Sequence, residues 1–142
     1  MQVLVDTCVL LRLLDVRDPK NALANECILG LHRSGHQTVI ARQNVYELWV
    51  VATRPVKSNG LGFSVEQTRL AVDKLGLLFT LLPDPASVYS DWLVLVTAYK
   101  VSGKSAHDAR LAAFMLGRGI RPIVTFNAVD FKRYAGIEVI EP

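Results

Sequence analysis

Five short apolar runs alternate with longer helical patterns along this chain, and no other feature of the sequence limits its possible folds as strongly. The runs are rich in valine, isoleucine and leucine, as buried strands are. They are Val3–Val5, Thr38–Ala41, Phe79–Leu82, Ile123–Phe126 and Ile137–Ile140. Strands separated by helices predict βαβ units, and therefore an α/β fold in which a central, mainly parallel sheet carries helices on both faces.

Helical patterns fill the intervals between these runs and have typical starting and terminating residues at their ends. We expect helices at Cys8–Leu14, Lys20–His32, Gln43–Arg54, Ser64–Leu75, Ala86–Lys100 and Ser105–Gly117, and a short helical turn at Val129–Tyr134. The apolar run that ends at Leu82 could instead prolong the helix before it. No repeat, low-complexity segment or linker divides the chain, so we expect residues 1–142 to form a single domain.

The composition is typical of a folded protein. Hydrophobic residues make up 51% of the chain and charged residues 20%, which excludes a disordered chain. No apolar run reaches the roughly 18 residues of a membrane span, and the first residues lack the basic segment of a signal peptide. We therefore expect a soluble, cytoplasmic protein. Its net charge of +3 and its sequence pI near 9.0 permit a polyanionic partner.

The two cysteines do not form a recognisable site. Cys8 and Cys27 have neither metal-ligand spacing nor a neighbouring cluster of other ligands. We expect reduced thiols in the core rather than a disulfide or a zinc site.

Asp6 is the first candidate for a functional residue, because it directly follows the first apolar run. An open α/β sheet binds its ligands at the carboxyl ends of its strands. A carboxylate in this position therefore predicts a site at that edge of the sheet, to which later residues would contribute.

Glu47 is the second candidate, since it interrupts the apolar helical segment VYELWVV. Its expected neighbours on the helix are Gln43, Asn44, Val50 and Val51. Burying an unpaired carboxylate costs several kcal/mol, so Glu47 must reach water, a cation or a partner. Two explanations are open: Glu47 lies on the solvent-facing side of its helix, or it faces the site.

Asp108, Asn127 and Asp130 also allow two explanations each. Ser105 to Asp108 has the spacing of a capping box, so Asp108 could cap the helix that it begins. Asn127 is a common turn residue and Asp130 a common residue at a helix start. However, all three lie beside predicted strand ends, where a side chain can also point into a site.

Considered together, these acids come from four elements, and strand ends and helix starts would bring at least three of them to one edge of the sheet. Crowded carboxylates repel one another and become partly protonated unless a cation neutralises them. Magnesium and manganese ions take oxygen ligands of this kind, activate water and offset charge on a phosphodiester. Without an evident histidine, cysteine or serine nucleophile, the pattern indicates metal-dependent phosphodiester hydrolysis.

Four segments resemble the blocks of a known family in their order and spacing. They are LVDTCVLL at 4–11, NVYELWVVATRP at 44–55, SAHDARLAA at 105–113 and VTFNAVDF at 124–131. In these segments the chain resembles the PIN domain family, and within it the VapC-type toxin ribonucleases of bacterial toxin–antitoxin pairs. The resemblance implies a three-layer α/β/α sandwich and a magnesium- or manganese-dependent endoribonuclease that cleaves single-stranded RNA.

The resemblance also implies roles for individual residues. Asp6, Asp108 and Asp130 would hold the metal ion, and Glu47 would position or deprotonate the attacking water. Thr7 would be the hydroxyl residue beside the first acid. Family members have an acid at the position of Asn127 or at that of Asp130, and here the first of these is an amide. We therefore assign Asp130 as the fourth acid and Asn127 as an orienting contact.

Partners are implied in the same way: an RNA substrate, a VapB-like antitoxin and a second copy of the chain in a homodimer. The candidate RNA-binding residues are Arg42, Arg54, Lys104 and Arg110, with Lys57, Lys132 and Arg133 as further basic residues that could contact RNA.

Two rival functions follow from the same features. A nucleotide-binding α/β domain could also have an acid after its first strand, but it would be expected to show a glycine-rich loop there, which Asp6 to Val9 lacks. The other rival is a PIN-like fold without catalysis, acting as an RNA-binding or scaffold module. Loss of an acid would favour that alternative, whereas Asp6, Glu47 and Asp108 are all present.

Overall fold

A computed structural model describes residues 1–142 and contains one five-stranded sheet. The strands are β1 (Gln2–Val5), β2 (Gln37–Ala41), β3 (Thr80–Leu82), β4 (Pro122–Val124) and β5 (Glu138–Ile140). Their order is β3-β2-β1-β4-β5, and every neighbouring pair is parallel. The predicted α/β fold with a mainly parallel sheet is therefore confirmed.

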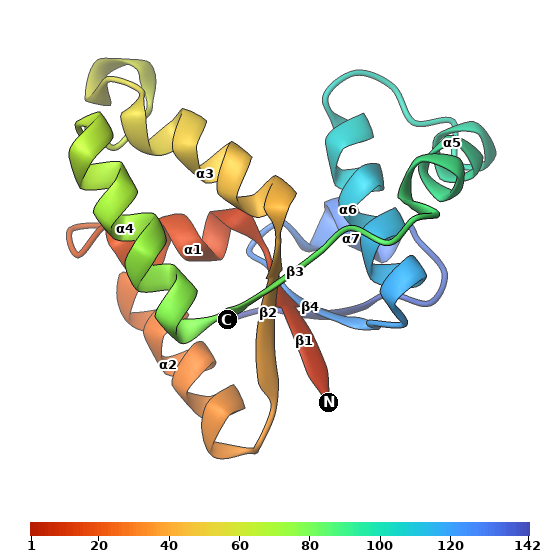
Figure 1. The fold of residues 1–142 in the computed structure, drawn as a ribbon, viewed down its shortest axis with the longest axis horizontal. Coiled ribbons are helices and arrows are strands. Elements are labelled where there is room, and N and C mark those ends of the chain that lie inside the picture. Colours follow the sequence, from red (N-terminus) through yellow and green to blue (C-terminus); the bar gives the residue numbers. More distant parts are fainter.

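Seven helices cover the sheet in two groups (Figure 1). The first group is α1 (Thr7–Leu14), α2 (Asn21–Arg33), α3 (Arg42–Thr53) and α4 (Val65–Leu78); the second is α5 (Val88–Ala98), α6 (Ser105–Arg118) and α7 (Ala128–Lys132). A buried apolar cluster lies beneath each group, with Leu10 and Leu48 in the first and Phe114 and Phe131 in the second. This arrangement confirms the three-layer α/β/α sandwich.

Local sequence features explain several element boundaries. Ser64 and Gln67 form the predicted capping box, in which each side chain accepts a hydrogen bond from the other residue's backbone N–H. The helix α4 continues to Leu78, and the run after it forms a separate strand, so the alternative of one long helix is wrong. A 3₁₀ turn at Val56–Ser58 follows α3.

Two predicted elements end earlier in the structure. The strand β4 stops at Val124, although the backbone N–H of Thr125 still donates to the carbonyl of Ile140 at 3.0 Å and its side chain bonds to Asp6. The apolar helix α5 is shorter than predicted and has no buried residue, so its apolar side chains are partly or largely exposed. No helix combines the length and the hydropathy that crossing a membrane requires.

The parallel register fixes where the site forms. Val5 is paired with Val124, and the backbone N–H of Asp6 donates a 3.0 Å hydrogen bond to the carbonyl of Val124. The residues that follow β1, β2 and β4 therefore lie at one edge of the sheet, where α1, α3 and the loop before α7 begin.

Candidate functional site

Asp6 is the centre of the site and is held by three donors. Its Oδ1 accepts a hydrogen bond from the backbone N–H of Thr7 at 2.8 Å. Its Oδ2 accepts from Thr125 Oγ1 at 2.7 Å and from Cys8 Sγ at 3.2 Å. Only 7% of Asp6 is exposed, and this burial raises the pKa of the carboxyl although the three hydrogen bonds lower it.

Glu47 points into the site from the first half of α3. Its Oε2 accepts a hydrogen bond from Thr7 Oγ1 at 3.1 Å, and its Oε1 accepts from Gln43 Nε2 at 2.7 Å. The solvent-facing alternative for Glu47 is therefore wrong. Tyr46 and Val50, in the same part of α3, are more exposed, with exposed fractions of 65% and 58%.

Two amide side chains hold this arrangement in place. Asn44 is fully buried, accepts a hydrogen bond from the backbone N–H of Ala41 and donates one to Thr7 Oγ1 at 3.1 Å. Gln43 donates to the carbonyl of His107 at 2.7 Å as well as to Glu47. The orientation of Glu47 is thus fixed from α1, α3 and α6.

Asp108 lies in the first turn of α6 but does not cap it. The helix begins at Ser105 after Lys104, and no side chain makes a capping hydrogen bond there, so the predicted capping box is wrong. The pKa of Asp108 is raised to about 7, first by burial and then by the charges of Asp130, Asp6 and Glu47, while Lys104 lowers it. Asp130, Asp6 and Glu47 are therefore close enough to Asp108 to disfavour its ionised form.

A cavity of about 690 Å³ opens at this edge of the sheet. Its lining residues come from α3, α6, the residue before α6 and the segment after β4, and they are Gln43, Tyr46, Glu47, Val50, Lys104, Ser105, His107, Asp108, Arg110, Asn127 and Asp130. Asp6 is buried beside this lining, and the Thr125 hydroxyl that bonds to it also accepts the backbone N–H of Asn127 at 2.9 Å. The side chain of Asn127 is exposed.

The four acids do not form a complete metal-binding site in this structure. No group of three or more histidine, cysteine, aspartate or glutamate side chains is arranged so that it could hold a metal ion. Their chemistry nevertheless fits a hard divalent cation, because the charges of neighbouring acids add to the effect of burial in raising the pKa of Asp6 and Asp108, and such a cation would offset this negative charge. Asp6, Asp108 and Asp130 are the oxygen donors that could hold one.

Of the four candidate RNA-binding residues, the structure places two in the cavity and two outside it. Lys104 and Arg110 line the cavity, whereas Arg42 and Arg54 do not. Arg110 is already engaged: NH2 donates to Asp84 Oδ2 at 2.9 Å and NH1 donates to Gln43 Oε1 at 3.0 Å. Arg110 therefore supports the arrangement of Gln43 in this structure.

Sequence analysis missed most of the uncharged residues of the site. Gln43, Asn44 and Thr125 were not singled out as site residues, because a neutral side chain does not conflict with its surroundings as a charged one does. The position of Thr125 next to a strand end was the one indication available. Cys8 and Cys27 are free thiols, as expected, but Cys8 donates to Asp6 and so belongs to the site.

Comparison with known proteins gives one family and a set of solved structures. The sequence profile of the PIN domain matches residues 3–137. A sequence search of curated proteins found no match. Solved structures match over nearly the whole chain at low sequence identity, which establishes a shared fold.

VapBC and VapC proteins are among these structures. VapBC2 from Rickettsia felis, crystallised with a DNA fragment from the promoter, has a TM-score of 0.75 and 16% identity, covering 100% of this chain and 99% of that chain. VapBC-1 from nontypeable Haemophilus influenzae has a TM-score of 0.71 and 17% identity, with 99% and 98% covered. VapC20 from Mycobacterium tuberculosis, described as a sarcin-ricin loop cleaving toxin, has a TM-score of 0.64 and 16% identity, with 90% and 92% covered.

The profile match spans all four sequence blocks, and the solved structures share the observed fold. The sequence and the structure thus lead to the same assignment: this chain belongs to the PIN domain family.

Proposed function

We propose that this chain is a magnesium- or manganese-dependent endoribonuclease that cleaves phosphodiester bonds of single-stranded RNA. One observation carries the proposal: Asp6, Glu47 and Asp130, from three other segments, lie so close to Asp108 that their charges, together with the larger effect of burial, raise the pKa of Asp108 to about 7. Membership of a nuclease family supports the same chemistry. An acid cluster of this kind at a sheet edge is suited to a divalent ion and a phosphate.

The acids of the site have two separate roles in the proposed reaction. Asp6, Asp108 and Asp130 would hold the metal ion, and Thr7 and Asn127 would support the acids beside them. A bound magnesium or manganese ion would lower the pKa of the attacking water and offset the charge that develops on the phosphate. Glu47 would accept the proton of the attacking water as the water oxygen bonds to phosphorus, while the bond from phosphorus to the departing ribose oxygen breaks and that oxygen takes a proton from solvent.

The hydrogen bonds to Glu47 suit this role as a base. Gln43 and Thr7 each donate to one carboxylate oxygen, which fixes the plane of the carboxylate before substrate arrives. An oriented base needs little rearrangement as the proton is transferred.

We further propose that the protein is the toxin of a type II toxin–antitoxin pair, acts in the cytoplasm and forms a homodimer. The similar structures of VapBC complexes support an antitoxin partner resembling VapB. For the homodimer, α5 offers apolar surface: Tyr89 and Val94 are 69% and 66% exposed.

The direct test is cleavage of single-stranded RNA by the purified protein in magnesium or manganese. We expect cleavage that a chelator abolishes and that Asp6→Ala removes while circular dichroism shows an intact fold. Asp73→Ala is the matched control, because Asp73 is an exposed acid on α4, remote from the cavity lining. Full activity of a folded Asp6→Ala variant would overturn the proposal, and RNA binding without any cleavage would favour the non-catalytic alternative.

A further inference from the structure

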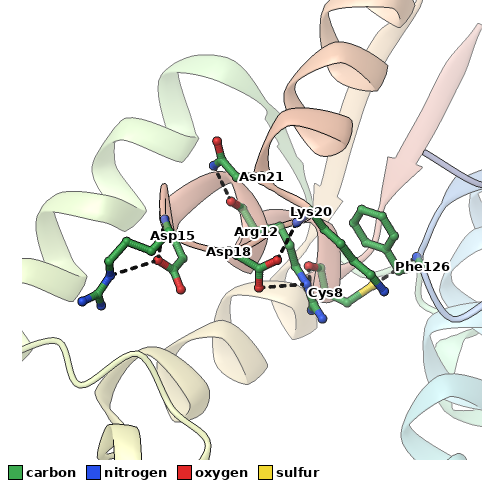
Figure 2. Close-up of polar contacts among 8 residues, drawn as sticks. Cys8, Arg12, Asp15, Asp18, Lys20, Asn21 and Phe126 are labelled. Atoms are coloured by element: carbon green, nitrogen blue, oxygen red, sulfur yellow. Dashed lines mark hydrogen bonds and ion pairs between the residues drawn. The ribbon is translucent and has the colours of Figure 1, made fainter.

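A second group of side chains lies next to Asp6 but outside the cavity (Figure 2). The ring of Phe126, in the segment after β4, has two cations over it. Arg12 Cζ of α1 lies 5.6 Å from the ring centroid, and Lys20 Nζ, from the residue before α2, lies 5.0 Å from it. Both distances are in the range of cation–π interactions.

This group is connected to the catalytic acid by short contacts. The backbone N–H of Phe126 donates to Cys8 Sγ at 3.4 Å, and Cys8 Sγ donates in turn to Asp6 Oδ2 at 3.2 Å. Arg12 NH1 donates to the carbonyl of Cys8 at 3.2 Å. The two cations are therefore held at a fixed place beside Asp6, on the side formed by α1 and the segment after β4.

The positive charge of this group is only partly neutralised. Arg12 pairs with Asp18 at 3.6 Å and Arg17 with Asp15 at 3.7 Å, whereas Lys20 takes part in none of the salt bridges. The guanidinium of Arg12 also has an unused donor, since its Nη1 donates to the carbonyl of Cys8, its Nε is buried beside Asp18, and its Nη2 donates to no protein atom. A phosphate could use both the charge of Lys20 and the remaining donor of Arg12.

A purely structural role accounts for only part of this arrangement. Asn21 donates to the carbonyl of Arg12 at 2.7 Å, and Asp18 accepts the backbone N–H of Lys20 at 2.8 Å, so these contacts hold the turn between α1 and α2. They explain Arg12 and Asp18. They involve the backbone of Lys20 but not its ammonium group. The side chain of Lys20 is exposed and lies over the ring of Phe126, and these contacts give no reason for its position.

We propose that Arg12 and Lys20 bind a backbone phosphate of single-stranded RNA that flanks the scissile phosphate, and that Phe126 holds the two cations in position. This inference rests on the proposed function and adds a substrate subsite to it. The physical reason is that the four acids repel an RNA strand, so a strand that crosses Asp6 needs cations on both sides. Lys104 supplies one in the cavity, and Lys20 and Arg12 supply them on the other side.

The test is RNA binding measured by fluorescence anisotropy with a labelled single-stranded oligoribonucleotide in manganese. All proteins carry Glu47→Gln, which removes the proposed base and so prevents cleavage during the measurement. We expect Lys20→Gln to weaken binding by about three- to tenfold and to make the salt dependence shallower by about one counterion, as loss of one phosphate contact does. Lys20→Arg should retain most of the affinity.

Two further variants separate this subsite from general charge effects. Lys74→Gln is the matched control, because Lys74 is exposed on α4 and takes part in no salt bridge, so it should bind like the parent. Phe126→Leu should weaken binding when Lys20 is present and have a smaller effect in the Lys20→Gln protein, because the ring acts through the cations.

The outcomes distinguish this inference from the function on which it rests. If Lys20→Gln binds RNA with the affinity and salt slope of Lys74→Gln while the wild-type chain cleaves RNA, the subsite is refuted and the nuclease proposal stands. If the wild-type chain cleaves no RNA but Lys20→Gln still lowers binding selectively, the subsite stands and the nuclease proposal fails. If the parent protein binds no RNA, the subsite is refuted, and cleavage by the wild-type chain alone decides the nuclease proposal.

Discussion

At the scale of single residues, burial and hydrogen bonding act in opposite directions on the pKa of Asp6. Asp6 accepts three hydrogen bonds that favour its ionised form, yet its pKa is raised because removal from water is the larger effect. Asp108 is less buried, and three neighbouring acids add to its shift. Both residues therefore hold their negative charge at a cost in folding free energy, which a divalent cation would offset.

The first prediction concerns the pH dependence of stability in the presence of a chelator. Because the pKa of Asp108 is about 7 in the folded state and near 3.8 when unfolded, the folded state binds an extra proton between these values. This contribution to stability is fully present below pH 3.8 and is lost as pH rises to about 7. Asp108→Asn cannot ionise, so its free energy of unfolding in urea should exceed that of wild type at pH 8. At pH 5 the difference between the variant and wild type should be smaller.

The control for this pH experiment is Asp73→Asn, an exposed acid on α4. It should follow the wild-type profile at both pH values. Equal effects of Asp108→Asn at pH 5 and pH 8 would show that repulsion and burial do not act on Asp108 as described.

The second prediction concerns Cys8. Burial and the charge of Asp6 raise the pKa of its thiol to about 12, so almost no reactive thiolate exists near neutral pH. Iodoacetamide labelling followed by mass spectrometry should modify Cys8 much more slowly in the folded protein than in urea. Cys27 is the internal comparison, because it is less buried and has no neighbouring acid among the causes of its pKa shift. Labelling of Cys8 as fast as Cys27 in the folded state would contradict this account.

At the scale of elements, the first turn of α3 determines how Glu47 is presented. Gln43 and Glu47 are four residues apart and so share one face of the helix. Gln43 has one amide orientation compatible with its contacts, since its Oε1 accepts from Arg110 and its Nε2 donates to Glu47 and to the carbonyl of His107. A series of hydrogen bonds thus runs from Asp84 through Arg110 and Gln43 to Glu47, the proposed base.

The third prediction follows from this chain of contacts. Gln43→Leu removes a hydrogen bond to a charged group, worth roughly 1.5–3 kcal/mol, so kcat should fall by about 10- to 100-fold. KM should change less, because Gln43 acts by positioning Glu47. Steady-state kinetics on single-stranded RNA measures both values. The control is Gln37→Leu, at an exposed glutamine at the start of β2, which should leave kcat and KM unchanged. A similar loss of kcat in Gln37→Leu would argue against the positioning role of Gln43. A change in KM alone for Gln43→Leu would do the same.

Features that depend only on residues close together in the sequence were predicted correctly. Features that depend on contacts with residues far along the chain were not. The capping box at Ser64 depends on residues three apart, and it forms as predicted. The same pattern at Ser105 does not, because the acid at Asp108 lies among other carboxylates instead of bonding to the helix start. Whether Glu47 faced solvent could not be decided locally either, since Thr7, one of its hydrogen-bond partners, is 40 residues away in the sequence.

At the scale of the whole molecule, the alternation of strands and helices was enough to predict the layers and the parallel sheet. The carboxyl ends of parallel strands lie at one edge of the sheet, which explains why the acids lie close together. The order β3-β2-β1-β4-β5 was not predicted, since which strands become neighbours depends on packing across the sheet. For the same reason, Thr125 beside Asp6 and the cations around Phe126 became visible only in the structure.

The fourth prediction concerns the folded molecule as a metal-binding unit. Manganese at about 100 times its Kd should stabilise the fold by about 2.7 kcal/mol and raise the Tm by roughly 5 to 10 °C, because only the folded chain brings the acids together. Differential scanning calorimetry with manganese or a chelator measures this shift. Asp6→Asn should be more stable than wild type in chelator and should gain less from manganese. Identical Tm values for wild type with and without manganese would contradict a shared metal site.

The hydrogen bond from Thr125 to Asp6 joins residues 119 positions apart, and β1 reaches β4 only across that interval. During translation the first acid is synthesised long before Thr125, so this edge of the sheet cannot assemble until β4 and Thr125 have left the ribosome. A nascent chain that ends before this point would therefore lack the activity proposed here.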